Sequence, residues 1–179
     1  MILGILASAG GGASTAYESI ATATGTGSSA TITFSSIPST YTHLQIRGMA
    51  NDGGGGNVQI RVNGDTGTNY SRHRLFGQGT TASATGSATQ AQIDTGMYAG
   101  YTTNTMSVFC IDLLDYASTT KYKTFRGLAG YDENGAGGIS VFSGLWQSTS
   151  AVTSISLIDN VQSFNTQTTF ALYGNKESA

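Results

Sequence analysis

The stretch Val58-Gln59-Ile60-Arg61-Val62-Asn63-Gly64 decides the fold class of this chain. Its three apolar residues alternate with polar ones, which is the two-residue period of a β-strand with one buried face. The Asn63-Gly64 pair is typical of a type I′ turn, because both central positions of that turn need a positive φ. We therefore expect a strand that turns back on itself, with residues 70–76 as the return strand of a hairpin.

Short alternating stretches of this kind continue along the whole chain. Gly, Ser and Thr account for 72 of the 179 residues, and only one residue is Pro. No stretch of ten or more residues carries apolar positions at helical spacing without being crowded by Gly, Thr or Ser, which argues against a substantial helix. Further strands are expected at 17–24, 30–34, 43–50, 106–114, 120–131, 139–146, 152–158 and 168–174, with a short strand near 91–93.

Two stretches depart from simple alternation. Residues 77–90 contain only Gly, Gln, Thr, Ala and Ser, which predicts an extended surface loop. Residues 106–114 are almost continuously apolar, which predicts a strand covered on both faces. Eight to ten short strands with Gly-rich turns favour one all-β domain over residues 17–179, an antiparallel β-sandwich, and a jelly roll is the specific form that we expect.

The charge content narrows the classes of partner. Eight basic and ten acidic residues give a net charge of −2, so no cationic surplus is present to neutralise phosphates, and nucleic-acid binding is not expected. Only 10% of the residues are charged, against about 25% in an average soluble domain. No run approaches the roughly 20 apolar residues of a membrane span. Strand faces rich in hydroxyls and amides are typical of surfaces that lie against other subunits.

The chain begins with an apolar segment, Met1-Ile2-Leu3-Gly4-Ile5-Leu6, followed by small residues. No Lys or Arg precedes Glu18, so the positive region of a signal peptide is absent. We expect residues 1–16 to form an extended N-terminal arm that docks on its own sheet or on a neighbouring subunit. The candidate subunit-contact residues are Met1, Ile2, Leu3, Ile5 and Leu6.

Catalytic residue types are scarce. The two histidines, His43 and His73, have no His, Cys or acidic neighbour at a metal-ligand spacing, so no zinc site is predicted. Asp112 and Asp115 are three positions apart and face opposite ways on a continuous strand, unlike the paired carboxylates of a glycosidase. Cys110 is the only cysteine and lies among apolar residues, which favours an inert thiol over a nucleophile. We expect no catalytic residue, no metal and no cofactor.

Two further features have a functional reading beside a structural one. The run Asp132-Glu133-Asn134 could join Asp52 or Asp65 in a calcium site, but it lacks the alternating ligand spacing of an EF-hand, and a simple turn is the favoured interpretation. Trp146 could stack on a sugar ring, although a lone Trp at a strand end is more often a core or interface anchor. It is therefore our candidate glycan or interface anchor.

Three motifs carry a resemblance to a known group of proteins. They are Ile37-Pro38-Ser39-Thr40-Tyr41-Thr42-His43-Leu44-Gln45-Ile46-Arg47, Ser143-Gly144-Leu145-Trp146 and Phe170-Ala171-Leu172-Tyr173-Gly174. The chain resembles short virion structural proteins of tailed bacteriophages, including marine and cyanobacterial phages, from its apolar start to its last strand. The final residues, 175–179, extend beyond that pattern.

The resemblance implies a β-sandwich component of the virus particle, a capsid decoration (cement) protein, and it supplies no catalytic residues. Its expected partners are the major capsid protein and further copies of itself, as a homotrimer on local threefold axes of the capsid surface. The alternative is a receptor-binding or fibre-tip module that recognises host glycans through residues 77–90 and Trp146. A glycan-degrading enzyme is disfavoured, because convergent acids are missing.

Overall fold

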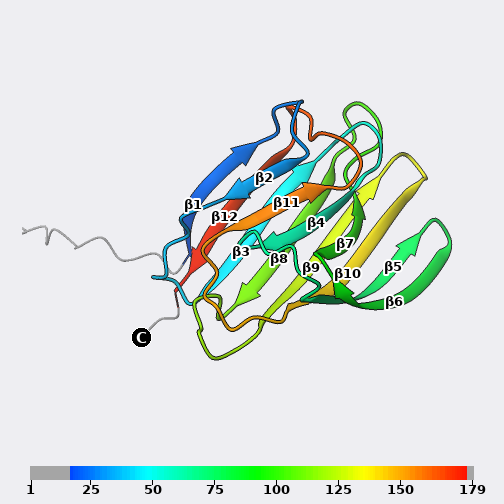
Figure 1. Cartoon of the computed structure of the whole chain (residues 1–179). Helices are drawn as coiled ribbons and strands as arrows, with labels where there is room; N and C mark the ends of the chain where they lie inside the picture. Colours follow the sequence, from blue (N-terminus) through cyan, green and yellow to red (C-terminus); the bar gives the residue numbers. More distant parts are fainter. Residues whose placement is uncertain (1–16, 177–179) are drawn as a thin grey trace, which may run out of the picture.

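The computed structural model describes residues 17–176, which form twelve β-strands in two layers (Figure 1). The strands are β1 (Tyr17–Thr24), β2 (Thr31–Phe34), β3 (His43–Ala50), β4 (Asn57–Val62), β5 (Tyr70–Gln78), β6 (Thr81–Gln90), β7 (Ile93–Tyr98), β8 (Ser107–Leu114), β9 (Lys123–Asp132), β10 (Gly137–Trp146), β11 (Ile155–Asp159) and β12 (Thr169–Asn175). The predicted all-β class is confirmed for these residues.

The two layers are a large sheet of eight strands and a small sheet of four. The large sheet has the order β1-β12-β3-β8-β9-β10-β5-β6, and the small sheet has the order β2-β11-β4-β7. Every pair of neighbouring strands is antiparallel, as the sandwich prediction requires. The jelly roll stays a prediction, because two antiparallel layers do not by themselves define that topology.

One hydrophobic core fills the space between the sheets. On β4, β8 and β12 every second residue points inward, so these strands build the core from the period-two alternation seen in the sequence. Its largest apolar side chains are fully buried: Tyr70, Tyr116, Phe125, Phe142, Phe164 and Phe170. Each sheet therefore has one covered face and one outer face.

The predicted turn after β4 forms, but the predicted hairpin does not. Asn63 and Gly64 have φ values of 51° and 67°, and the N–H of Asp65 donates to the carbonyl of Val62 at 2.9 Å. The following strand, β5, nevertheless enters the large sheet, where it pairs with β10 and β6. The reason is that β4 already has a neighbour on each side, β11 and β7, and offers no free edge.

The prediction of a surface loop at residues 77–90 is wrong. A two-residue turn at Gly79 (φ 55°) and Thr80 returns the chain into β6, which pairs with β5. Gly at the first central position is typical of a type II′ hairpin turn. Figure 1 shows this β5–β6 hairpin at the edge of the large sheet, extending past the small one.

Candidate interaction surface

The outer face of the large sheet carries an unusual set of apolar side chains. On β8, Ser107, Phe109, Ile111 and Leu113 point into the core, whereas Val108 and Leu114 point outward and are more than half exposed. The prediction that residues 106–114 are covered on both faces is therefore wrong within residues 17–176. One side of this apolar strand has no cover there.

The exposed apolar residues of the middle strands form one surface, which we call the apolar face. Its members have exposed fractions between 47% and 60%: Met49, Leu75, Val108, Leu128, Ile139 and Val141. Six side chains of this size, each about half exposed, present on the order of 500 Å² of apolar surface, as much as the largest patch on a typical monomer. The largest apolar patch of a monomer is often functional.

The strand register makes the apolar face contiguous. One row of direct cross-strand neighbours runs from Cys110 through Leu128, Val141 and Leu75 to Ala84. A second row joins Met49 to Val108, then passes over Gly130 to Ile139. Side chains directly opposite each other on one face of a sheet are in contact range.

The apolar face is not flat and contains two shallow hollows, one of them at a glycine. A shallow hollow of about 250 Å³ lies over β8, β9 and β10, where Gly130 leaves a gap between Val108 and Ile139. A second hollow, of about 580 Å³, continues over β10, β5 and β6 past Val141 and Ala84. The face is thus uneven enough to receive side chains of another protein.

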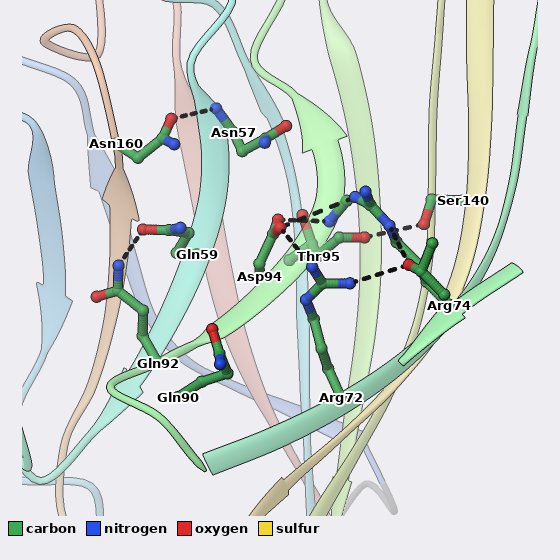
Figure 2. Close-up of polar contacts among 12 residues, drawn as sticks. Asn57, Gln59, Arg72, Arg74, Gln90, Gln92, Asp94, Thr95, Ser140 and Asn160 are labelled. Carbon is green, nitrogen blue, oxygen red and sulfur yellow. Dashed lines mark hydrogen bonds and ion pairs between the residues drawn. The ribbon is translucent and has the colours of Figure 1, made fainter. Parts of the chain in front are cut away.

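The opposite surface of the sandwich, the outer face of the small sheet, is polar. It presents hydroxyl and amide side chains: Thr31, Thr33, Asn57, Gln59, Gln92 and Ser156. Several bond to each other, for example the Thr33 and Ser156 hydroxyls at 2.9 Å and the Gln59–Gln92 pair in Figure 2. The two outer faces therefore differ in chemistry. The large sheet bears the apolar face beside exposed polar residues such as His73 and Arg126, whereas the small sheet is mainly polar and partly satisfied by its own hydrogen bonds.

A charged cluster fixes the β5–β6 hairpin against the small sheet (Figure 2). Arg72 and Arg74 project from β5 toward Asp94 of β7, at 3.4 and 3.8 Å from its Oδ2. Both guanidinium groups also donate to the Thr85 hydroxyl of β6, at 3.3 and 3.1 Å. Three strands meet at this cluster, so the hairpin that bears Leu75 and Ala84 is held at a defined angle to the rest of the sandwich.

Trp146 is a core residue, which excludes the role of exposed glycan or interface anchor for its ring. Its side chain is only 3% exposed, and its Nε1–H donates to Asp65 Oδ2 at 2.7 Å. Asp65 also accepts from Asn69 and from the Gly67 N–H. These donors, led by Trp146, lower the pKa of Asp65.

We expect Asp65→Ala to lower the free energy of unfolding by about 1.5–3 kcal/mol, because the buried indole N–H would lose a charged partner. Chemical denaturation at pH 7 measures the loss. Asp65→Asn keeps an acceptor oxygen and should lose less. Because the folded pKa is lowered, this stabilisation is present above the ordinary Asp pKa and disappears as the pH falls through the folded value. Equal losses for both variants would contradict this account.

The histidines and the cysteine do not form a reactive site. His43 Nδ1 accepts the Asp115 N–H at 3.2 Å, at the end of the large sheet. His73 lies on the outer face of β5, while Arg72 and Arg74 point inward. Cys110 is half-buried beside Leu128 on the apolar face. It therefore lies at the margin of the apolar face.

The acidic residues that the sequence singled out are separated in space. Asp112 accepts from Gln45 and Arg126, whereas Asp115 pairs with Lys121 at 2.5 Å. Glu133 accepts from the Tyr101 N–H and from the Thr105 hydroxyl. Within residues 17–176, no three His, Cys, Asp or Glu side chains gather closely enough to hold a metal ion.

A carboxylate pair that sequence reasoning missed lies beneath the Gly-rich loop after β3. Asp159 is 3% exposed; its Oδ1 accepts two backbone N–H groups, and its buried Oδ2 has no donor. Asp52, beside it, accepts from the N–H groups of Gly54, Gly55 and Gly56. Burial, and then the neighbouring Asp52 carboxylate, raise the pKa of Asp159 to about 6.

This pair predicts that Asp159→Asn changes the pH dependence of stability. A carboxyl with a raised folded pKa stabilises the fold below its unfolded pKa, and that stabilisation is lost as the pH rises through about 6. The free energy of unfolding of Asp159→Asn minus that of the wild type should therefore increase between pH 4 and pH 7, by at most about 3 kcal/mol. Urea denaturation at a series of pH values gives the difference, and a flat or falling difference would contradict the assignment.

Comparisons of the chain with protein-family models, with curated proteins and with solved structures found no match. The candidate contact residues Met1, Ile2, Leu3, Ile5 and Leu6 lie outside the described residues. No helix able to cross a membrane occurs within residues 17–176. The apolar face is therefore the feature on which a functional proposal rests.

Proposed function

We propose that this protein is a structural subunit of a tailed-phage virion, a decoration (cement) protein that binds the major capsid protein on the surface of the assembled shell. The observation that carries the proposal is the apolar face. A sandwich that bears an apolar patch on one outer side and is mainly polar on the other is suited to lie flat on a larger assembly, with its polar side toward solvent.

Most of the resemblance motifs lie in the sheet that also bears the apolar face. Residues 43–47 lie in β3, Ser143-Gly144-Leu145-Trp146 ends β10, and Phe170-Ala171-Leu172-Tyr173-Gly174 lies in β12. All three strands belong to the large sheet, which bears the apolar face. The features that resemble virion proteins and the surface suited to contact thus share one layer.

The proposed mechanism is stabilisation by mass action. A subunit that binds the assembled shell and not its dissociated parts stabilises the shell by RT ln(1 + [L]/Kd), about 2.7 kcal/mol per site at 100 times Kd. This role needs no metal site and no catalytic group. It needs a rigid contact surface, which a sheet packed on a core provides.

The glycan-recognition alternative loses both features on which it depended. Residues 77–90 form a hairpin strand and not a loop, and the Trp146 ring is buried under Asp65. A sugar platform needs an exposed aromatic face. We therefore propose the decoration role alone.

Adding the purified protein to undecorated capsids tests the proposal. We expect saturable co-sedimentation with the shells and an increase in the temperature at which they release their contents. A protein added at the same concentration but heat-unfolded beforehand controls for nonspecific adsorption. No binding, together with no gain in heat resistance, would refute the decoration role.

A further inference from the structure

The β6 edge of the large sheet has the properties of a self-association site. β6 is the last strand of the large sheet and pairs with β5 alone within the described residues, so its other edge presents unpaired backbone N–H and C=O groups. Its first six residues are all exposed. A long exposed edge strand is a template for pairing with another chain.

Soluble proteins usually protect such an edge, and β6 lacks most of the usual protection. Charged side chains, proline, β-bulges and short strand length are the common devices. β6 is ten residues long, and its sequence, Thr-Ala-Ser-Ala-Thr-Gly-Ser-Ala-Thr-Gln, contains no charged residue and no proline. Its register with β5 is unbroken from Thr81 to Ser87, and the one irregularity follows Ser87.

The other three sheet edges are less suitable. β1 is interrupted by an irregularity between Ser19 and Ala21. β2 has only four residues. β7 is irregular opposite β4 and contains Gly96 at φ 71°. Within residues 17–176, β6 is therefore the edge that offers an unbroken ladder of seven residues.

We propose that two copies of this chain pair through their β6 edges, antiparallel and related by a two-fold axis, so that two large sheets become one continuous sheet. A two-fold axis brings the same edge of each copy together, so no second complementary surface is needed. The small, uncharged side chains of β6 place neither bulk nor like charges opposite each other.

The geometry of β6 also aligns the apolar faces of the two copies. Ala82 and Ala84 lie directly opposite Gly77 and Leu75, on the outer side of the sheet. Pairing at β6 therefore joins the two apolar faces edge to edge, and the hollow lined by Leu75, Ala84 and Val141 lies next to the axis. The inference goes beyond the proposed function, because it requires no capsid.

Pairing of the whole regular stretch fixes the register. Thr81 to Ser87 overlaps fully with its copy only when Ala84 faces Ala84, so Thr81 then faces Ser87. Directly opposite residues of antiparallel strands have Cα atoms about 4.5–5.5 Å apart, which lies within the range that a disulfide spans. A cysteine at Ala84 should therefore bond to its own copy, whereas one at Thr81 should not.

Two measurements on the full chain test the proposal. The first is mass by analytical ultracentrifugation from about 1 μM to about 1 mM, because an interface of this small size associates weakly. We expect the mass to rise from one chain to two. Ala84→Lys, which places like charges together at the axis, should weaken dimerisation at least tenfold. The matched control Val161→Lys, at a 65% exposed site in the loop after β11, should leave it unchanged.

The second measurement is oxidative cross-linking in a Cys110→Ser background, which removes the native thiol. Ala84→Cys should form a disulfide dimer readily, Thr81→Cys should not, and a mixture of Thr81→Cys with Ser87→Cys should cross-link between the two variants. This result does not depend on whether Ala84→Lys folds. A chain that stays monomeric throughout, a trimeric mass, or a dimer that is lost on Leu128→Lys and kept on Ala84→Lys would overturn the proposal. Failure of the protein to bind capsids would refute the decoration role but would not bear against self-association through β6.

Discussion

Phe170→Ala should lower the free energy of unfolding by about 3–5 kcal/mol, the range found when a buried aromatic ring is removed. Phe170 is fully buried on β12, with ring centroids 5.7 Å from Phe109 and 6.1 Å from Phe164. Its ring also lies against Gly48 of the adjacent strand, where a Cβ would come within 2.3 Å of the ring. Gly48 has no side chain that could fill the space that the ring leaves.

Equilibrium denaturation measures this loss. Because small domains have a total stability of about 5–15 kcal/mol, the variant should be partly unfolded at elevated temperature. Phe170→Leu, which keeps most of the apolar volume, should lose less, and Val161→Ala, at an exposed site, should change stability by less than about 0.5 kcal/mol. A loss below about 1 kcal/mol for Phe170→Ala would contradict the assignment of one core between the two sheets.

The double variant Leu128→Lys/Val141→Glu should reduce capsid binding by at least about 100-fold, because each side chain contributes roughly 1.5–3 kcal/mol when it is buried at an interface. The two residues are direct cross-strand neighbours and are about half exposed. Opposite charges at paired positions are compatible with the sheet, so the thermal stability of the isolated protein should hardly change.

The control for this variant makes the same charge changes elsewhere. Val161→Lys/Thr31→Glu places the same charges at two exposed positions away from the large sheet, one in the loop after β11 and one on the outer face of β2. Co-sedimentation with undecorated capsids compares the two double variants. Equal binding by both would show that the apolar face does not contact the shell.

The sequence predicts the strands well because their pattern is local. The predicted bounds of β1 and β3 match the structure, and the Asn63-Gly64 turn has the expected positive φ values. The alternation of apolar and polar residues predicts which residues of a strand share a face, but it does not predict which other strand pairs with it. The transfer of β5 to the large sheet depends on β11 and β7 occupying both sides of β4, and β11 is almost a hundred residues away.

The sequence does not reveal features that depend on distant partners. β6 lacks apolar alternation, so its sequence cannot be distinguished from that of a loop. It is a strand because its backbone pairs with β5. Trp146 packs in the core, where Asp65, from the β4–β5 connection, accepts its N–H. Lys123 is fully buried because the carbonyls of Ser118, Lys121 and Thr149 accept from its Nζ.

The wrong prediction for residues 106–114 rested on a real feature of the sequence. Residues 106–114 were expected to be covered on both sides because they are apolar throughout. The small sheet covers the inner side of β8, whereas Val108 and Leu114 on its outer side remain exposed. An apolar residue on the outer side of a strand is consistent with a contact on that side, and we propose that another protein of the particle makes this contact.

Imaging of the virus particle at a resolution that places this subunit tests the central proposal most directly. We predict that the outer face of the large sheet, with Leu128, Ile139 and Val141 at its centre, rests on the major capsid protein, and that the polar face of the small sheet points to solvent. A subunit whose apolar face is exposed to solvent on the particle, or a particle without this subunit on its shell, would contradict it.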